Sequence, residues 1–522
     1  MSNRPPQSRF DPARPRERHF QPQTFHDLMA EQLSHAPWIT LSAACHALVL
    51  LMLYVLVPAS TRTETKALTR VDQTQTPTPD SPPPPAPPKV VEEPEEKQVV
   101  VDETQVPDTD RDRTAFDSTT SGDTGFDAFG NDVGKESAFD SNQWNAAVGL
   151  GGGAGGRYGG RSGGKGGGRG GGGKSYAAAI DAGLQWLKNH QDDDGKWDCD
   201  QFMKHDTDGE PCDGPGSAVH DVGVTGLALL AFLGDDSTMR SGPYRETVKK
   251  GVLWLRSQQQ PNGLFGTDAS HDFVYDHAIA AYAMCEAYGL SQYHLLANTA
   301  QRGINYLESH RNPYSVWRYL PRDNDNDTSV TGWCVMAYES GDYFKLTVNK
   351  QALELAAVWF DSVSDPTGRH GYTRAGERSS RKPGEHATRF PVERGEALTA
   401  VGLFCRFFIG QDPKEKPVMT AAANLIAQRP PVWDPKGGSI DFYYWYYGTY
   451  ALFQMGGRHW TDWQKMLEPA VVKTQHREKE HKNLYGSWDP IDAWGEDGGR
   501  VYSTAILVLT LEAYYRYSKL LR

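Results

Sequence analysis

Apolar residues recur at helical spacing along residues 175–522, and they mark two kinds of helix that alternate along the chain. In the first kind, a small residue is followed three positions later by an aromatic residue. Residues three apart share a helix face, so the small residue permits close helix packing and the aromatic residue fills the space beside it. Four helices carry this signature, at Gly183 and Trp186, Gly251 and Trp254, Gly303 and Tyr306, and Ala356 and Trp359.

The second kind of helix is apolar around most of its circumference, which is typical of a buried helix. Six such helices are predicted, at residues 222–233, 278–288, 329–338, 397–409, 443–455 and 502–517. A single helix pair of this size is too small to bury its own apolar face, so the pairs must stack or close on one another. The pattern therefore predicts an all-α domain over residues 175–522, a six-helix-pair α/α toroid with the apolar helices inside.

The first three inner helices open with a similar phrase that begins with an aspartate, at Asp221, Asp276 and Asp327. An aspartate at a helix start commonly accepts hydrogen bonds from the free backbone amides of the first turn. We therefore expect these three residues to be helix N-caps.

An uncharged apolar segment at residues 36–58 precedes the toroid. A run of about 22 apolar residues can cross a hydrocarbon core of about 30 Å, so a transmembrane helix is predicted. Arginines in the tail, residues 1–35, outnumber the basic residues that closely follow the segment, which favours a cytoplasmic N-terminus. The sequence thus predicts a single-pass bacterial inner-membrane protein with its C-terminal domain in the periplasm. A cleaved signal peptide is the alternative, because residues 57–59 loosely fit a cleavage site.

Residues 59–174 are rich in proline, aspartate and threonine and then in glycine, with few large apolar side chains. Such a composition cannot bury a core, so a disordered linker is predicted. The whole chain carries 54 basic and 66 acidic residues, a formal net charge of −12. This charge argues against a nucleic-acid partner, which would need a basic surface.

The chain has six cysteines, too few for a disulfide scaffold. Cys199 and Cys212 flank a polar loop and could form a disulfide in an oxidising compartment. Free thiols, or a zinc site shared with His205 and His220, are the alternatives, but the spacing matches no short Cys-x-x-Cys motif. We therefore predict neither a metal nor a cofactor.

Ser42 and His46 lie four residues apart in the apolar segment, so they share one helix face, and a titratable residue in a membrane helix usually has a function. Together with the proline-rich run at residues 82–88, this segment resembles the N-terminal region of TonB-type energy transducers. In that family, a serine and a histidine at this spacing contact a proton-driven ExbB/ExbD-type complex. The resemblance implies the same contact for Ser42 and His46. Nothing after residue 110 resembles the receptor-binding domain of such transducers, so transport coupling does not follow.

The helix pairs, the Asp-Gly-Lys-Trp phrase at residues 194–197 and the helix start at Asp327 resemble the prenyltransferase and squalene-cyclase repeat superfamily. The resemblance implies the same toroid, which serves several unrelated chemistries. Aligned on Asp327, the protonating acid of a squalene cyclase falls at Asn326, which is not an acid. The Asp-x-Cys zinc motif of protein prenyltransferases and the thioester motif of complement-type domains are also missing.

Aromatic and acidic residues at the starts of the inner helices are candidates to line a ligand cavity. They are Tyr275, Asp276, Trp317, Tyr443, Trp445, Tyr447 and Tyr502. Packing within the core is the alternative role for these aromatic residues. A hydrophobic or saccharide ligand would suit such a cavity, and the charged cluster of Arg389, Glu393, Arg394 and Glu396 would lie near its mouth or in a solvated loop.

Two functional hypotheses follow. The first is a noncatalytic ligand- or partner-binding toroid, coupled through His46 to the proton-driven complex; the missing acid and zinc residues favour it. The alternative is a terpenoid-cyclase-like enzyme, or a polysaccharide or isoprenoid lyase, that uses Asp325 and Asp327 as acids beside the aromatic cavity. The sequence therefore favours a noncatalytic protein over an enzyme.

Overall fold

The structure, a computed structural model, describes residues 173–207, 209–478 and 481–517. Helices make up the regular structure of these residues, and extended pairing within them is confined to two isolated bridges, Gln259 with Phe265 and Ser364 with His370. The all-α prediction is therefore confirmed for the described part of the chain.

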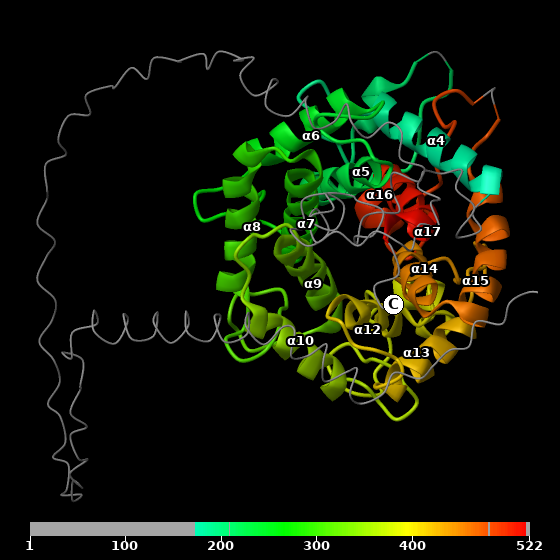
Figure 1. Ribbon diagram of the computed structural model, residues 1–522. Coiled ribbons are helices and arrows are strands. Elements are labelled where there is room, and N and C mark those ends of the chain that lie inside the picture. The colour runs from blue at the N-terminus through cyan, green and yellow to red at the C-terminus, as the bar shows by residue number, and fades with distance from the viewer. Residues whose placement is uncertain (1–172, 208, 479–480, 518–522) are drawn as a thin grey trace, which may run out of the picture. The chain divides into compact units, whose positions relative to one another are not determined.

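Six long helices form a closed inner ring (Figure 1). Each packs against the next along the chain, and the last packs against the first. The inner helices are α5 (Asp221–Gly234), α7 (Phe273–Ser291), α9 (Thr328–Tyr343), α12 (Ala397–Phe408), α14 (Phe442–Met455) and α16 (Gly495–Leu511). Nearly every residue of α5 is buried, as expected for a helix that is covered on all sides.

Six further helices surround this ring, and each precedes its inner partner in the chain (Figure 1). They are α4 (Gly173–Asn189), α6 (Arg245–Ser257), α8 (Ala297–His310), α10 (Lys350–Ser362), α13 (Pro417–Ala427) and α15 (Gly457–Ala470). These helices bury one face alone; α6, for example, buries Val248, Val252 and Leu255 and exposes its charged face. The predicted toroid of six helix pairs is therefore the observed architecture.

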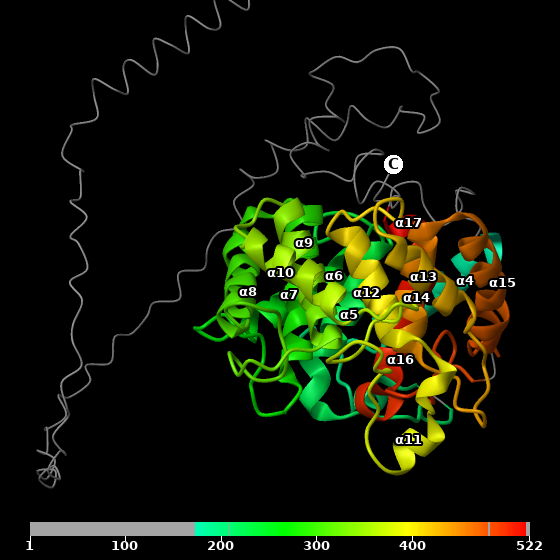
Figure 2. The same cartoon turned by 90° about the horizontal axis from the view of Figure 1, so that it is seen from below.

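Short helices complete the connections. They are η1 (Phe202–His205), η2 (Ala218–His220), η3 (His294–Leu296), α11 (Glu385–Arg389), η4 (Val392–Arg394), η5 (Val472–Thr474) and α17 (Ala513–Arg516). Figure 2 shows α11 on the face of the ring where α16 begins. The long connection that contains α11 therefore lies over the N-terminal ends of the inner helices.

The last inner helix differs most from its predicted bounds of 502–517. It begins at Gly495, bends at Gly499 and ends at Leu511, and α17 follows as a separate element. Gly499 has φ 64°, and a Cβ there would lie 2.4 Å from the backbone nitrogen of Gly216, so a residue without a side chain is required. The apolar pattern does not reveal this bend, because the helix start is polar and glycine-rich.

A buried aromatic residue follows several outer helices and binds the end of that helix. The indole nitrogens of Trp197, Trp317 and Trp488 donate to the carbonyls of Leu187, Leu307 and Val471, at 2.7, 2.8 and 2.7 Å. Because these carbonyls lie at helix ends, where the regular pattern of intrahelical hydrogen bonds stops, the indole bonds help to stabilise the ends. The tryptophan of the Asp-Gly-Lys-Trp phrase is thus a structural residue.

The ring closes at a seam, which we define as the contacts of the first pair (α4, α5) with the last pair (α15, α16) and the connection between α15 and α16. The hydroxyl of Tyr176 donates to the carbonyl of Gln464 at 3.0 Å. The indole of Trp186 donates to the carbonyl of Asn483 at 2.8 Å. These bonds join residues that are nearly 300 positions apart, so the first and last pairs depend on each other.

The predicted membrane helix at residues 36–58, with Ser42 and His46, lies outside the described residues, as does most of the predicted linker. Among the residues that the structure describes, none of the helices combines the length and apolar character needed to cross a membrane.

Candidate functional site

A cavity of about 480 Å³ lies at the end of the ring where the inner helices begin. All six inner helices contribute residues to its wall. These are Gly223, Val224 and Leu227 of α5, Tyr275, Asp276 and Ile279 of α7, Ser329 and Trp333 of α9, Ala397 and Leu398 of α12, Tyr443 of α14, and Gly498, Tyr502 and Ile506 of α16. The closed ring therefore creates the site, since no single pair could enclose it.

The cavity has an apolar interior and a polar rim. Leu227, Ile279 and Ile506 lie a turn or more into their helices and line the interior together with Trp333. The rim comes mainly from the connections between helices, which supply His220, His271, Asp272, Tyr319, Tyr372, Ser379, Ser380, Arg381, Lys382, Pro383 and Trp494. Asp497 adds to it from the first turn of α16. Such a distribution suits a ligand with a large apolar body and a polar end.

A histidine and an aspartate form a close pair on this wall. His220, the last residue of η2, has its Nδ1 atom 3.0 Å from Oδ2 and 3.2 Å from Oδ1 of Asp276 in the first turn of α7. Asp272 lies near the other ring nitrogen, with 3.9 Å between His220 Nε2 and its Oδ2 atom. Both members of the pair line the cavity.

The pair holds a proton near neutral pH. Burial raises the pKa of Asp276 to about 6, although the hydrogen bond and charge of His220 act in the opposite direction. Burial by itself would lower the pKa of His220, but the hydrogen bond and charge of Asp276 outweigh it and raise that pKa. Because the two groups interact strongly, they titrate together, and the bound proton cannot be assigned to one of them alone. The pair can therefore donate or accept a proton at the cavity wall.

A second buried carboxyl lies behind the aromatic wall. Asp327 is fully buried, and its Oδ1 accepts the backbone N–H of Val330 at 2.7 Å as the N-cap of α9. The hydroxyl of Tyr372, which lines the cavity, donates to its Oδ2 at 3.3 Å and lies 2.8 Å from the hydroxyl of Tyr319. Burial raises the pKa of Asp327 to about 7, against the effects of the Val330 amide, Arg318 and Tyr372.

The structure corrects the two predicted catalytic acids. The side chain of Asp325 is 69% exposed and pairs with Arg318 at 3.3 Å, on the outside of the loop. Asp327 serves as a helix cap and does not reach the cavity wall, from which Tyr319 and Tyr372 separate it. The physical reason is the helix start itself, because the free amides of the first turn attract the carboxylate of Asp327.

Of the three predicted N-caps, Asp327 alone has that role. Asp221 is already the first residue of α5; it accepts the N–H of Cys199 at 2.8 Å and pairs with Lys196 at 2.7 Å. Asp276 lies within the first turn of α7 and pairs with His220. The similar phrases therefore place their aspartates at slightly different points of the helix start, with different partners.

Four of the predicted cavity residues line the cavity: Tyr275, Asp276, Tyr443 and Tyr502. The others belong to the core. Trp317 is fully buried against Tyr338, with ring centroids 5.1 Å apart, and Trp445 is buried against Trp433 and Phe442. Tyr447 packs edge-on against Trp333 at 5.4 Å, behind the cavity wall.

The predicted charged cluster near the mouth does not form one site. Glu396 is buried and pairs with Arg369 at 2.8 Å, whereas the half-exposed Arg389 pairs with Glu496 at 3.3 Å. A different arginine reaches the cavity: Arg381 forms a buried ion pair with Asp441 at 2.6 Å and lies 5.7 Å above the ring of Trp494. Within the described residues, the buried indole nitrogen of Trp494 has no hydrogen-bond partner.

Cys199 and Cys212 are buried free thiols that do not pair with each other. The Sγ atom of Cys199 lies 3.3 Å from the carbonyl oxygen of Gly498, whereas Cys212 Sγ lies 3.0 Å from that of Asn483. The predicted disulfide is therefore not formed, because the loop directs the two thiols to different parts of the seam. Three further cysteines are buried in the inner helices: Cys285, Cys334 and Cys405.

The sequence pattern offered His220 as a possible zinc ligand and did not place it, or most of the rim, at the cavity. His220 precedes the phrase that begins at Asp221, and a histidine next to an aspartate-led helix start was an available signal. Tyr319, Tyr372 and Arg381 lie in loops outside the repeated phrases, where periodicity says nothing. Closure of the ring brings these residues together.

The sequence matches no protein-family model and no curated protein. Several solved structures resemble the toroid, each over 65% of this chain. A cellobiose 2-epimerase from Bacillus thermoamylovorans has 13% identity, is matched over 97% of its own length and gives a TM-score of 0.45. An unsaturated glucuronyl hydrolase specific for heparin has 14% identity, 96% coverage and a TM-score of 0.45. A type II terpene cyclase from Scytonema has 13% identity, 97% coverage and a TM-score of 0.40. These similarities are too weak to assign a function.

Proposed function

We propose that the toroid is an enzyme that binds a mostly apolar, isoprenoid-like molecule in its cavity and transfers a proton to one of its carbon atoms. The observation that carries this proposal is the His220–Asp276 pair, 3.0 Å apart, on the wall of a cavity with an apolar interior. Asp276 replaces Asp325 and Asp327 as the reacting acid.

The interior supports an apolar substrate. Aliphatic side chains such as Leu227 and Ile506 would contact its body, and the faces of Trp333 and Tyr443 would stabilise positive charge that develops on it. A saccharide would need more hydrogen-bonding groups than the interior offers. The polar rim, with Lys382 and Asp497, would hold the polar end of the substrate.

The pair supplies the chemistry. In its acid form the Asp276 carboxyl donates its proton to a double bond of the substrate, and the hydrogen bond to His220 stabilises the carboxylate that forms. Return of a proton from a neighbouring carbon to this carboxylate regenerates the acid and leaves an isomerised or cyclised product. A carboxyl with a pKa near 6 is suitably placed for both directions of transfer near neutral pH.

The test follows solvent deuterium. The full-length protein is incubated in D₂O with squalene, geranylgeraniol or an isoprenoid extract, and the products are analysed by mass spectrometry. We expect a product that carries deuterium at carbon, and Asp276→Asn should reduce its rate of formation by about 10²- to 10⁴-fold because the variant lacks the acid.

The matched control is Asp325→Asn, which changes an exposed acid outside the cavity and should leave the rate unchanged. Binding of the same ligand by wild type and Asp276→Asn without any deuterium incorporation would contradict the enzyme and identify a noncatalytic binding protein. An unchanged rate in Asp276→Asn would equally contradict the assigned acid.

A further inference from the structure

A histidine, an aspartate and a cysteine, which are residue types that can bind metals, meet at the seam, away from the cavity. His190 follows the last residue of α4, and Asp206 and Cys212 lie in the connection from η1 to η2. Their candidate ligand atoms are all within 4.8 Å of one another. His190 Nε2 lies 3.3 Å from Asp206 Oδ1 and 3.9 Å from Cys212 Sγ.

The orientation of His190 presents an electron pair to the other two groups. Its Nδ1 lies 2.8 Å from the carbonyl oxygen of Trp186, which can only accept, so Nδ1 carries the hydrogen. In the neutral ring Nε2 is then bare and faces a carboxylate oxygen that is also an acceptor. Two acceptors at this distance are held together either by a proton on one of them or by a metal cation between them. A metal-binding histidine usually donates the N–H of its other ring nitrogen to a backbone carbonyl or a carboxylate.

The distances fit a tetrahedral zinc-type ion. Bonds of about 2.0–2.1 Å to nitrogen or oxygen and about 2.3 Å to sulfur place N and O ligands about 3.3 Å apart and N and S ligands about 3.6 Å apart. The measured separations are 3.3 Å for His190 and Asp206 and 3.9 Å for His190 and Cys212. The thiol lies within 4.8 Å of the Asp206 carboxylate, so it would have to move inward to complete the three-ligand set.

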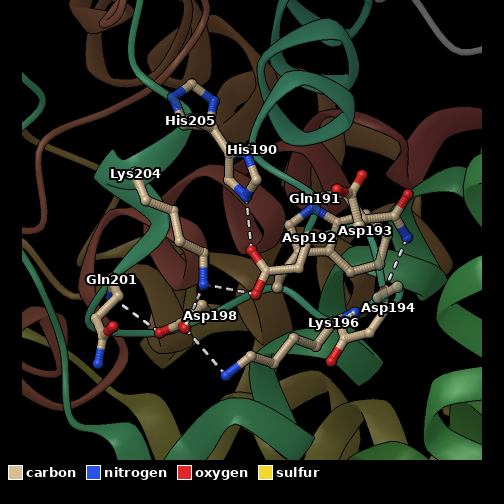
Figure 3. A network of polar contacts seen from close by, with 12 residues as sticks. His190, Gln191, Asp192, Asp193, Asp194, Lys196, Asp198, Gln201, Lys204 and His205 are labelled. Carbon is tan, nitrogen blue, oxygen red and sulfur yellow. Dashed lines mark hydrogen bonds and ion pairs between the residues drawn. The ribbon is translucent and has the colours of Figure 1, made fainter.

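The surrounding structure holds the ligands in place. The N–H of Cys212 donates to Oδ2 of Asp206 at 2.6 Å, which leaves the other carboxylate oxygen toward His190. Upstream, the ammonium group of Lys204 lies between the carboxylates of Asp192 and Asp198, at 2.6 and 2.8 Å, and fixes η1 (Figure 3). Two of the ligands are buried, with His190 4% and Cys212 5% exposed, and Asp206 is partly buried.

We propose that His190, Asp206 and Cys212 bind a single zinc-type divalent cation that stabilises the seam, with water as the fourth ligand. The site would connect the end of α4 to a loop that contacts the last helix pair, since Cys212 Sγ lies 3.0 Å from the carbonyl oxygen of Asn483. The site lies in the connection that follows α4, and none of its ligands belongs to an inner helix or to the cavity.

A nearby group of acidic residues lacks the features of a metal site. Asp198, Asp200 and Asp221 also lie close together, but Lys196 is 3.0 Å from Asp198 and 2.7 Å from Asp221. A lysine ammonium already balances these carboxylates, and neither sulfur nor imidazole is present. The cation is therefore expected at the mixed nitrogen, oxygen and sulfur site.

Cobalt spectroscopy tests the site. The full-length protein is purified, freed of metal with a chelator and titrated with Co²⁺. We expect about one equivalent to bind with the intense visible bands of tetrahedral cobalt and a thiolate-to-cobalt band in the near ultraviolet, and Zn²⁺ should displace it. Cys212→Ser should abolish the thiolate band and weaken binding by about 100-fold or more, and Asp206→Asn should weaken it as well.

Cys199→Ser is the matched control, because Cys199 is another buried free cysteine of the same connection and should leave the spectrum unchanged. Zn²⁺ should also raise the melting temperature of the metal-free wild type by about 3–6 °C, and Mg²⁺ should not. The melting-temperature measurement uses the wild type alone, so it tests the proposed site even if Cys212→Ser does not fold. No thiolate band, or a band that survives Cys212→Ser, would overturn the proposal.

Discussion

Acidic residues stand at the start of all six inner helices, but their surroundings give them different chemistry. The set comprises Asp221, Asp276, Asp327, Glu396, Asp441 and Asp497. The positive end of each helix dipole favours a carboxylate there, which explains the regularity. Burial and partners decide the rest: Asp276, beside His220, has a pKa near 6 and Asp327, behind Tyr372, has a pKa near 7.

Asp492 allows the effect of burial on a carboxyl pKa to be tested at the scale of one residue. Its Oδ2 accepts from the N–H of Phe442 at 3.1 Å and the hydroxyl of Tyr502 at 3.3 Å, and burial, with the nearby charge of Asp441, raises its pKa to about 8. A carboxyl whose pKa is raised on folding binds its proton more tightly in the native state. Its contribution to stability is complete at low pH and is lost as the pH rises from about 4 to about 8.

We therefore expect the free energy of unfolding of the wild type to fall relative to that of Asp492→Asn across this range, by up to about 1.4 kcal/mol per pH unit. Urea unfolding of both proteins at pH 5 and pH 8 measures the difference. The comparison with the variant removes the parallel effects of Asp276 and Asp327. Equal pH slopes in the two proteins would show that Asp492 is ionised in the native state.

At the scale of helices, the outer helices rely on small residues to fit against the aromatic residue of the preceding pair. A Cβ on Gly251 of α6 would lie 2.9 Å from Leu229 of α5 and 2.9 Å from Trp197. A Cβ on Gly303 of α8 would lie 2.8 Å from Phe265, which follows α6. Each glycine thus joins neighbouring pairs, which is the packing that its recurrence in the sequence predicts.

Gly251→Val should force α6 outward and destabilise the protein by about 1–3 kcal/mol, because a well-packed interface has no room for the added methyl groups. Thermal unfolding followed by circular dichroism measures the loss. Lys249→Ala, on the exposed face of the same helix, should stay within about 0.5 kcal/mol of the wild type. A variant Gly251→Val with wild-type stability would mean that α6 can shift freely.

The helices could be predicted because an apolar circumference, as in residues 222–233, has few packing solutions other than an inner ring. Because apolar residues surround these helices, the sequence does not show which residues line the cavity and which pack in the core. In α14 both Tyr443 and Trp445 are apolar enough for either face, so sequence could not tell that Tyr443 points into the cavity and Trp445 into the layer beneath Trp433. His220 and Tyr372 lie in connections, whose course depends on contacts made by the whole ring.

At the scale of the molecule, the ring is held together where its ends meet. The rings of Tyr176 in α4 and Tyr514 in α17 are 6.2 Å apart, and Gln475 donates to the carbonyl of Ala179 at 2.9 Å. The inner ring closes through contacts between α16 and α5. In a toroid, unlike an open solenoid, the first and last helix pairs pack against each other, so the ring closes only when all the pairs are present.

Removal of residues 457–522, which include α15, α16 and α17, should abolish cooperative unfolding, because it exposes the apolar faces of α4, α5 and α14. Calorimetry and size-exclusion chromatography measure this, and we expect aggregation or a melting temperature lower by more than about 10 °C. The control removes residues 1–172 and leaves every described helix pair in place. A truncated protein that still unfolds in one sharp transition at the wild-type temperature would contradict this view of the ring.

The seam also determines how the molecule would respond to a mechanical load. The polypeptide enters the toroid at α4, and the bond from Tyr176 to Gln464 lies near this entry, whereas the bond from Trp186 to Asn483 lies ten residues further along the helix. A pull on the preceding chain would act on these bonds one after the other, so that α4 would peel from its first turn. Under force the ring would open at its join and unravel in chain order.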